Sequence, residues 1–407
     1  MVGYLRGIRD VADLTSSVIT RSAGRPKADP RPPGTSADAL APLTAIPLDA
    51  WRALEARAVE PNGYYLADWE LAVNAHAEGR THARTLAACS DESDGRLIGL
   101  LPVISFRRAY RLPLPALVNA DAYGTLSTPL LDRDAPRAAI MGLFAQARQS
   151  GARAIVLHNA ALDGPAMRTI QAVLAEHGLA PRIVTAHARA SLDATRNAED
   201  VLRDGLGAKK LKDLRRQRNR LAEQGDISFH VTRTREEIDA ALDIFLALEA
   251  SGWKGRRGTA LMQSAGDAAF IRQATRALAA RGQCEIVTLK AGGTPVASGV
   301  VVRHLSRAYY FKIGIDERFA KFSPGVQLTL DVTRHLCADP AIASADSTAA
   351  PGHPMIDPIW RERLAIGDVV LPLYRNDPVA TLVYAMLALR HRARERIKRL
   401  LHRLRRQ

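Results

Sequence analysis

The residues best suited to carry chemistry lie between positions 346 and 353. Asp346, Ser347 and His353 all fall in the segment DSTAAPGH. A carboxylate or an imidazole can accept a proton from a reacting group, directly or through a water molecule, and a hydroxyl can donate one. Each residue also has a structural interpretation: Asp346 could cap a strand end, Ser347 could cap a turn, and His353 could be an ordinary loop histidine. The spacing gives a candidate centre for proton transfer, and Asp316, one residue past another predicted strand, is a further candidate carboxylate.

A second candidate is the turn Ser323-Pro324-Gly325, between a predicted strand and a predicted helix. A helix N-terminus leaves about four backbone N–H groups unpaired, and the helix dipole favours anions there. Gly325 would let a phosphate approach the backbone closely, and Lys321 would add positive charge. The residues predict a phosphate-binding turn; an ordinary strand-to-helix turn with a serine cap is the alternative.

Aromatic and cationic side chains gather at a third place. Trp253, Lys254 and Gly255 are followed by two arginines, between two predicted helices. A tryptophan beside cations could bind an anionic or sugar-like substrate, whereas a solvated loop with one packing tryptophan is the alternative. Arg363, on a helix predicted near 358–365, is a candidate for pairing with Asp346 or with substrate.

The elements that must position these residues are predicted in the same order twice. In residues 41–200 the apolar periodicity predicts helices at 48–58, 67–76, 135–149 and 165–176, and strands at 83–89, 96–106, 115–120, 153–158 and 181–187. In residues 201–378 it predicts helices at 236–250, 265–281, 326–337 and 358–365, and strands at 227–232, 284–289, 295–303, 308–315, 341–345 and 368–373. A helix at 201–224 joins the two halves. The expected fold class is α/β with a mixed sheet.

Two further segments flank these halves. Residues 1–40 are expected to form an N-terminal extension with a disordered Pro-rich linker. Residues 379–407 are expected to form a basic amphipathic helix, because apolar residues recur at helical spacing between arginines and lysines. This helix could lie on an anionic membrane surface, bind RNA, or pack its apolar stripe on the body of the protein.

The charge of +15 is concentrated in two places. Residues 203–225 hold eight Lys/Arg and three Asp/Glu, and residues 385–407 hold nine Lys/Arg and one Glu. The rest of the chain is nearly neutral, which argues against a generally basic nucleic-acid coat. No RNA-binding signature accompanies either stretch, so nucleic acid is not the expected partner.

Cysteine usage and hydropathy indicate the compartment in which the protein is expected. The three cysteines, Cys89, Cys284 and Cys337, are far apart and lack metal-ligand spacing, so we expect no metal and a reducing compartment. The N-terminus has no apolar run of the length of a secretory signal, and no segment of the chain approaches the length of a membrane span. The expected location is the cytoplasm, with peripheral contact at the inner face of the membrane if the C-terminal helix binds lipid.

Several stretches resemble one enzyme superfamily over roughly residues 43–375. They are GLLPV at 99–103, GTLSTPLL at 124–131, KKLKDLRRQRNRLAEQG at 209–225, LEASGWKGRRGTAL at 248–261, YYFKIGIDERFAKFSPGVQL at 309–328 and DSTAAPGHPMIDPIWRERLAI at 346–366. The order of elements is similar to the GNAT acyltransferase fold used twice. The chain resembles the CelD/BcsL-type acetyltransferases linked to bacterial polysaccharide synthesis, which are related to the Fem peptidyltransferases.

The resemblance implies an acyl-CoA donor, with acetyl-CoA or a longer acyl-CoA, and an amine acceptor on a sugar, a lipid precursor or another envelope metabolite. The donor arm would lie where the strand at 307–315 diverges from the strand at 341–345. The implied donor-binding residues are Ile313, Gly314, Lys321, Ser323, Gly325 and Val326; the implied acceptor-binding residues are Trp253, Lys254, Tyr310, Lys312 and Arg363; and the implied catalytic residues are Asp346, Ser347, His353 and Asp316. The first half, with Asp121, Tyr123 and Thr128, would support the second and line the acceptor groove.

Direct attack by the amine is expected, because no cysteine is placed for a covalent relay. One departure from the superfamily is that the fuller Gly-rich signature of its phosphate-binding turn is absent and only Gly325 remains. Two alternatives stay open: a Fem-like transferase that uses aminoacyl-tRNA, and a non-catalytic component of a polysaccharide-synthesis complex.

Overall fold

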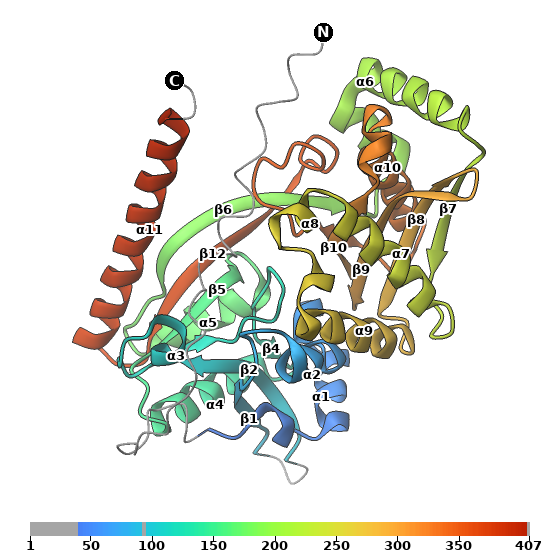
Figure 1. Cartoon of the computed structure of the whole chain (residues 1–407). Helices are drawn as coiled ribbons and strands as arrows, with labels where there is room; N and C mark the ends of the chain where they lie inside the picture. Colours follow the sequence, from blue (N-terminus) through green and yellow to red (C-terminus); the bar gives the residue numbers. More distant parts are fainter. Residues whose placement is uncertain (1–39, 92–94, 405–407) are drawn as a thin grey trace.

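The computed structural model describes residues 40–91 and 95–404. The Pro-rich segment predicted at 22–38 lies outside the described residues. Twelve strands form one mixed sheet, in which all but two of the strand pairs are antiparallel (Figure 1). The fold class predicted from the sequence, α/β with a mixed sheet, is confirmed.

The sheet runs continuously through both predicted halves. Its order is β1 (Arg84–Cys89), β2 (Leu97–Ser105), β3 (Ala116–Asn119), β5 (Ala154–Ala161), β12 (Glu362–Pro372), β6 (Arg182–Asp193), β11 (Ser344–Asp346), β10 (Arg307–Ile315), β9 (Thr294–His304), β8 (Cys284–Ala291) and β7 (Ile227–Thr232), while β4 (Leu130–Leu131) pairs with β2. The last strand of the chain, β12, lies between β5 and β6 and is antiparallel to both. In turn β6 pairs with β11 of the other half. The two halves are therefore interlocked by their final strands.

Helices cover both faces of the sheet. One face carries a core that extends across both halves, built by α1 (Leu48–Ala56), α2 (Ala67–His76), α4 (Pro136–Gln149), α5 (Pro165–Glu176), α7 (Ile238–Ser251) and α9 (Ala265–Ala279). On the other face, α6 (Ala198–Ala222) and α10 (Pro324–Cys337) cover the strands of the second half, and α3 (Phe106–Tyr110) and α11 (Pro378–Leu404) cover those of the first. The short α8 (Trp253–Arg257) follows α7.

Local sequence explains where several elements begin and turn. Asn197 caps α6 by accepting hydrogen bonds from the N–H groups of Glu199 and Asp200. Gly207, at φ 72°, kinks the same helix. The hairpin between β8 and β9 turns at Gly292 and Gly293, which both have positive φ, as the AGG motif predicts.

One predicted element is wrong. Residues 351–359 form turns, and the chain enters β12 at Glu362, so there is no helix at 358–365. Pro351, Pro354 and Pro358 interrupt helical hydrogen bonding there. The apolar residues after them then alternate in a strand that is paired on both sides.

Candidate acyl-transfer site

The site is built around the point where β10 and β11 part. The two strands pair in parallel only from Arg307 to Tyr309, opposite Ser344 to Asp346. β10 then continues to Ile315 with β9 as its only paired strand among the described residues. Thr348, just past the end of β11, donates its hydroxyl to the carbonyl of Tyr310 at 2.7 Å. The remaining edge of β10 therefore has no strand partner, as expected for the diverging strands.

A β-bulge in β10 sets which side chains face which side. The register with β9 shifts between Tyr310 and Lys312. Tyr310 packs into the core beside α10, whereas Phe311 packs against the core on the opposite face of the sheet. The ammonium of Lys312 lies 5.8 Å from the centre of the Phe311 ring. Both Tyr310 and Lys312 were predicted to bind the acceptor, and strict alternation along the strand would put their side chains on one face of the sheet. The bulge instead sends them to opposite faces.

Asp346 is fully buried and paired. Its Oδ2 accepts a hydrogen bond from the guanidinium of Arg189 on β6, whose side chain is 2% exposed, and its Oδ1 accepts one from the N–H of Thr348 at 2.8 Å. Both carboxylate oxygens of Asp346 are therefore engaged by groups of the protein itself. Ser347 is buried next to it and accepts a hydrogen bond from the N–H of Ala349 at 3.3 Å.

Beside this ion pair lie polar atoms that no described group satisfies. Tyr64 Oη, Arg189 Nε and Thr125 Oγ1 are buried and have no hydrogen-bond partner among the described residues. Burial, with the charge of Asp346 adding to it, raises the pKa of Tyr64, so its hydroxyl keeps its proton. Since buried polar groups are normally paired, this junction of the two halves is suited to hold water or a polar ligand group.

Lys254 and Lys312 meet at one buried carboxylate. Glu249 Oε1 lies 3.4 Å from the Nζ atoms of both lysines, and its Oε2 accepts a hydrogen bond from the N–H of Leu261 at 3.0 Å. Burial opposes ionisation of Glu249, but the charges of Lys312 and Lys254 outweigh it and lower the pKa of the carboxyl. The structure thus brings two predicted acceptor-binding lysines together.

His353 faces the same lysine from the loop after β11. Burial lowers the pKa of His353, Asp357 acts against that shift, and the charge of Lys254 adds to it. The ring is therefore neutral at pH 7. Its Nδ1 accepts a hydrogen bond from the N–H of Met355 at 3.4 Å, which leaves the ring proton on Nε2. His353 accordingly presents an N–H donor rather than a free base.

The Ser-Pro-Gly turn forms the start of α10, as predicted. Ser323 is left-handed at φ 54° and makes no side-chain cap, and Pro324 is the first helical residue. Gly325 is buried, and a Cβ there would lie 3.0 Å from Met355 Sδ and 3.3 Å from Ile315. Val326 stays partly exposed. The turn can present N–H groups to an anion, with the loop of His353 against it.

The other predicted residues have structural partners. Asp316 caps the turn after β10 and pairs with Arg318, whose hydrogen bonds lower the pKa of the carboxyl. Arg363 donates to the Trp360 carbonyl and lies 3.7 Å from Asp357, so it does not pair with Asp346.

The remaining members of the predicted donor and acceptor sets lie around the same strand. Gly314 packs directly on the backbone of α7, where a Cβ would lie 2.8 Å from Glu249 N. Ile313 accepts a hydrogen bond from Lys254 at 3.3 Å, and Lys321 stacks over Phe322 at 4.8 Å. Trp253 is 38% exposed beside Arg257.

The first half reaches the site through Tyr123. This residue has a left-handed backbone (φ 54°), donates its hydroxyl to Asp267 at 2.7 Å, and lies with its ring centroid 5.7 Å from Lys312 Nζ. Thr128, by contrast, is buried and accepts a hydrogen bond from the N–H of Ala161. Of the three residues predicted in this loop, Tyr123 is the one that borders Lys312.

Sequence reasoning missed Glu249, Arg189 and Tyr64. Glu249 lies near the end of an apolar helical stretch, four residues before Trp253. A carboxylate at that position could have drawn attention to it as a partner for the neighbouring cations. Arg189 and Tyr64 carry no local motif. Their positions depend on the pairing of β6 with β11 and on the packing of the two halves.

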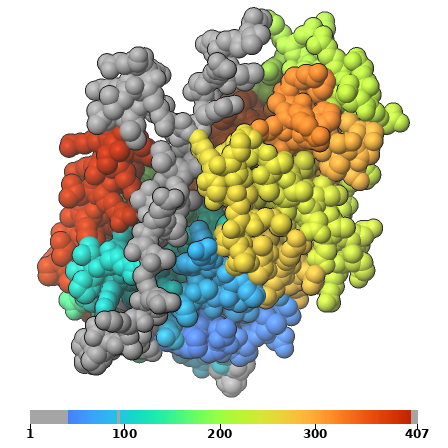
Figure 2. Space-filling model, viewed as in Figure 1, coloured from blue at the N-terminus to red at the C-terminus, as the bar shows by residue number. Residues whose placement is uncertain are grey.

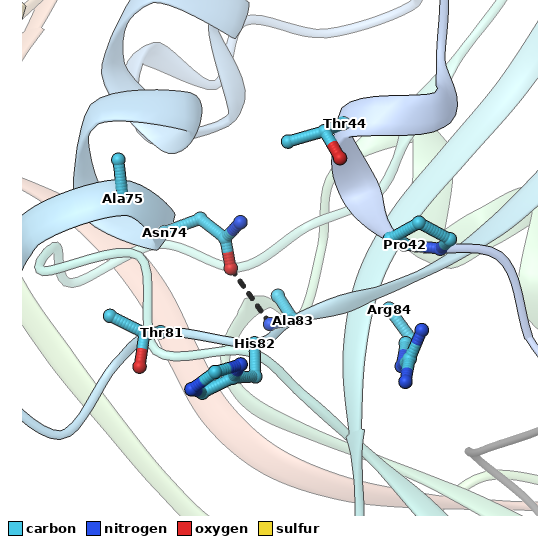
Figure 3. A pocket seen from close by; sticks show the side chains of 8 residues that line it. All are labelled: Pro42, Thr44, Asn74, Ala75, Thr81, His82, Ala83 and Arg84. Atoms are coloured by element: carbon cyan, nitrogen blue, oxygen red, sulfur yellow. Dashed lines mark hydrogen bonds between the residues drawn. The ribbon is translucent and has the colours of Figure 1, made fainter.

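A separate pocket lies away from this site. It measures about 390 Å³ and is lined by residues of α2, β1 and the segments before them: Pro42, Thr44, Asn74, Ala75, Thr81, His82, Ala83 and Arg84 (Figure 3). Asn74 points into the loop and accepts a hydrogen bond from the N–H of Ala83 at 2.8 Å. Within the part of the chain that the structure describes, no group of three or more His, Cys, Asp or Glu side chains is arranged to hold a metal.

Comparison with known proteins identifies the second half. Residues 208–350 match the family model described as an acetyltransferase (GNAT) domain. No curated protein matches the chain. Among the solved structures that share the fold, FemX has 11% identity and a TM-score of 0.53, and the match covers 83% of this chain and 98% of that one. The C-terminal DUF2156 domain of a putative lysylphosphatidylglycerol synthetase from Agrobacterium fabrum has 13% identity and a TM-score of 0.51, and the match covers 84% of this chain and 95% of that one. Residues 208–350 therefore match a GNAT acetyltransferase domain, which supports the prediction of an acyltransferase enzyme.

Proposed function

We propose that this protein is an N-acyltransferase that transfers an acyl group from acyl-CoA to an amine. The observation that carries the proposal is the parting of β10 and β11 after three paired residues, within the domain that matches the GNAT family. The open edge of β10 would receive the pantetheine arm by backbone hydrogen bonds. The first turn of α10, with Gly325 and Val326, would hold the pyrophosphate.

The proposed reaction is direct aminolysis. The amine attacks the thioester carbonyl carbon, the C–S bond breaks, and the CoA thiolate leaves and takes up the proton that the attacking nitrogen loses. The Nε2–H of His353 would stabilise the negative charge that develops on the carbonyl oxygen. Cys284 is buried with a raised thiol pKa, which argues against a covalent relay through it.

The acceptor would approach from the side of Lys254 and Lys312. Both ammonium groups lie 3.4 Å from the Glu249 carboxylate, and Tyr123 and Trp253 supply aromatic surface nearby. These features favour an acceptor that carries an anionic group besides its amine. A sugar or lipid precursor of the cell envelope, of the kind handled by CelD/BcsL-type enzymes in polysaccharide synthesis, is the acceptor class we propose, with the enzyme acting in the cytoplasm.

A second candidate donor is aminoacyl-tRNA. The feature that favours it is the basic surface of α6, on which Lys209, Lys210, Lys212, Arg215 and Arg220 are exposed, next to α10 (Figure 2). One of the solved structures that share the fold is the C-terminal domain of a putative lysylphosphatidylglycerol synthetase. A non-catalytic role is the third alternative.

The first test is ligand-dependent thermal stability with CoA, acetyl-CoA and a long-chain acyl-CoA. A ligand at 100 times its dissociation constant should stabilise the fold by about 2.7 kcal/mol. Gly325→Glu should abolish this shift, whereas Gly325→Ala, which adds the same Cβ against Met355 without charge, should largely retain it.

The outcomes separate the candidates. Loss of binding in both Gly325 variants would point to packing rather than to an anion at the turn. No shift with any CoA, together with salt-sensitive binding of tRNA, would replace the proposal with the second candidate. No binding of either would favour the non-catalytic role.

A further inference from the structure

The last helix, α11, is firmly attached to the body at its beginning. Asp377 caps it by accepting hydrogen bonds from the N–H groups of Val379 and Ala380, and pairs with Arg153. Ala380, Val383 and Leu387 are buried against the strands β5 and β12 and against Phe106. At its beginning the helix therefore packs on the body, which is one of the three alternatives left open for it.

A second apolar stripe faces outward. Leu382, Leu389 and Ile397 are 52%, 67% and 58% exposed. Their spacings of seven and eight residues place them on one side of a helix, over about 22 Å of its length. Ala385 and Ala393 are exposed on the same side. Three of the ten most exposed large apolar side chains of the described chain therefore lie along one line on one helix.

Cations flank this stripe. Residues 378–399 contain six Arg/Lys and one Glu, a net charge of +5. Arg390 lies over the ring of Tyr110 at 5.3 Å, and Lys398 pairs with Glu395 at 3.0 Å. Arg392, Arg396 and Arg399 are exposed. The helix stands at the edge of the molecule, with its far end extending away from the sheet (Figures 1 and 2).

We propose that this outward face of α11 docks on an anionic lipid surface. Leucine and isoleucine at helical spacing would enter the boundary between headgroups and acyl chains, and the arginines would remain at the phosphates. RNA would be bound by the arginines alone and would gain nothing from Leu389 and Ile397. No helix among the described residues is long and apolar enough to cross a membrane, so the contact proposed here is peripheral. It does not depend on the donor used in acyl transfer.

The test is sedimentation of the full chain with vesicles of phosphatidylcholine alone or with one quarter phosphatidylglycerol. Binding is expected only to the anionic vesicles. Neutralising two arginines in R392Q/R396Q should weaken it roughly 30-fold, at about 1 kcal/mol for each cation near the surface. The apolar variant L389E/I397E should lose it, and M141E, which places one negative charge on an exposed apolar position of α4, should not.

Two controls make the result decisive. Leu389→Trp should show a blue shift of its own fluorescence, above that of the native tryptophans, on anionic vesicles. Thermal stability should be close to wild type in all variants, because the substituted side chains are exposed. Absence of vesicle binding by the wild type, or equal binding by L389E/I397E, would overturn the proposal, and salt-sensitive RNA binding by the wild type in its place would assign the helix to nucleic acid.

Discussion

The buried pair of Arg189 and Asp346 holds the two halves together where β11 ends. Replacing Arg189 by methionine would leave Asp346, which has no exposed surface, without its counter-charge. Removing one partner of a buried ion pair typically costs about 3–5 kcal/mol. The variant would also lose the hydrogen bond from Arg189 to the Thr125 carbonyl at 2.6 Å. We therefore expect R189M to fall at the upper part of that range.

A double-mutant cycle separates the charge effect from lost packing. Asp346→Asn keeps an acceptor for the N–H of Thr348 but leaves Arg189 without a charge partner, so it should also destabilise the protein. R189M/D346N removes both charges and should be clearly more stable than the sum of the single changes predicts, with a coupling of about 2–3 kcal/mol. The measurement is urea unfolding followed by tryptophan fluorescence and by circular dichroism. The reasoning would be refuted if the changes in unfolding free energy of the two single variants were additive, or if R189M lost less than about 1 kcal/mol of unfolding free energy.

Three further predictions concern other buried contacts. His304 accepts a hydrogen bond from Asn62 N and lies 3.0 Å from the Glu55 carbonyl, and burial lowers the pKa of its ring to about 4. Because an unfolded histidine titrates near 6.5, the stabilising effect of the neutral ring, on the order of 3 kcal/mol, is complete above pH 6.5 and is lost as the pH falls towards 4. The difference in unfolding free energy between wild type and H304Q should therefore narrow from pH 7 to pH 4.5 in urea unfolding, and a constant difference would contradict this. A Cβ at Gly124 would lie 2.3 Å from the ring of Tyr64, so G124A should lower stability by about 1–3 kcal/mol, whereas G79A, where nothing lies within 4 Å, should show only the smaller cost of its positive φ. Glu249→Gln should destabilise by about 1–3 kcal/mol because it removes the negative charge that Lys254 and Lys312 both contact at 3.4 Å. Partial restoration of stability by the further change Lys254→Met would support that cause, and no restoration would oppose it.

Local patterns were enough to predict most elements. The strand at 227–232 and the helices at 67–76 and 165–176 begin and end where the structure has them, because their apolar periodicity and flanking turn residues are short-range signals. The divergence of β10 from β11, which the resemblance to the GNAT fold implied, is also found. The prediction of a helix near 358–365 was wrong because β12 is stabilised by pairing with β5 and β6, which lie some 170–220 residues earlier in the chain.

Part of the candidate site was predictable from its segments. Lys254, Lys312 and His353 do lie around the same edge of β10, as expected from their segments. The partners of Asp346 and the face on which Tyr310 lies could not be read from local spacing. Arg189 reaches Asp346 through the pairing of β6 and β11, and Tyr310 changes face because of a one-residue bulge. Both depend on long-range register, which a single sequence does not display.

The interlocked final strands determine when the sheet can be completed during synthesis of the chain. While the chain is being made, β5 and β6 are complete long before β12, and neither can pair across the position that β12 will occupy. Until residue 372 is available, two apolar strand edges stay open in the middle of the future sheet, a state that favours misassociation with other chains. A gene cut between the halves, or a stop codon before residue 362, would therefore yield two incomplete sheets rather than two working modules, so the duplicated architecture is inherited as a single folding unit.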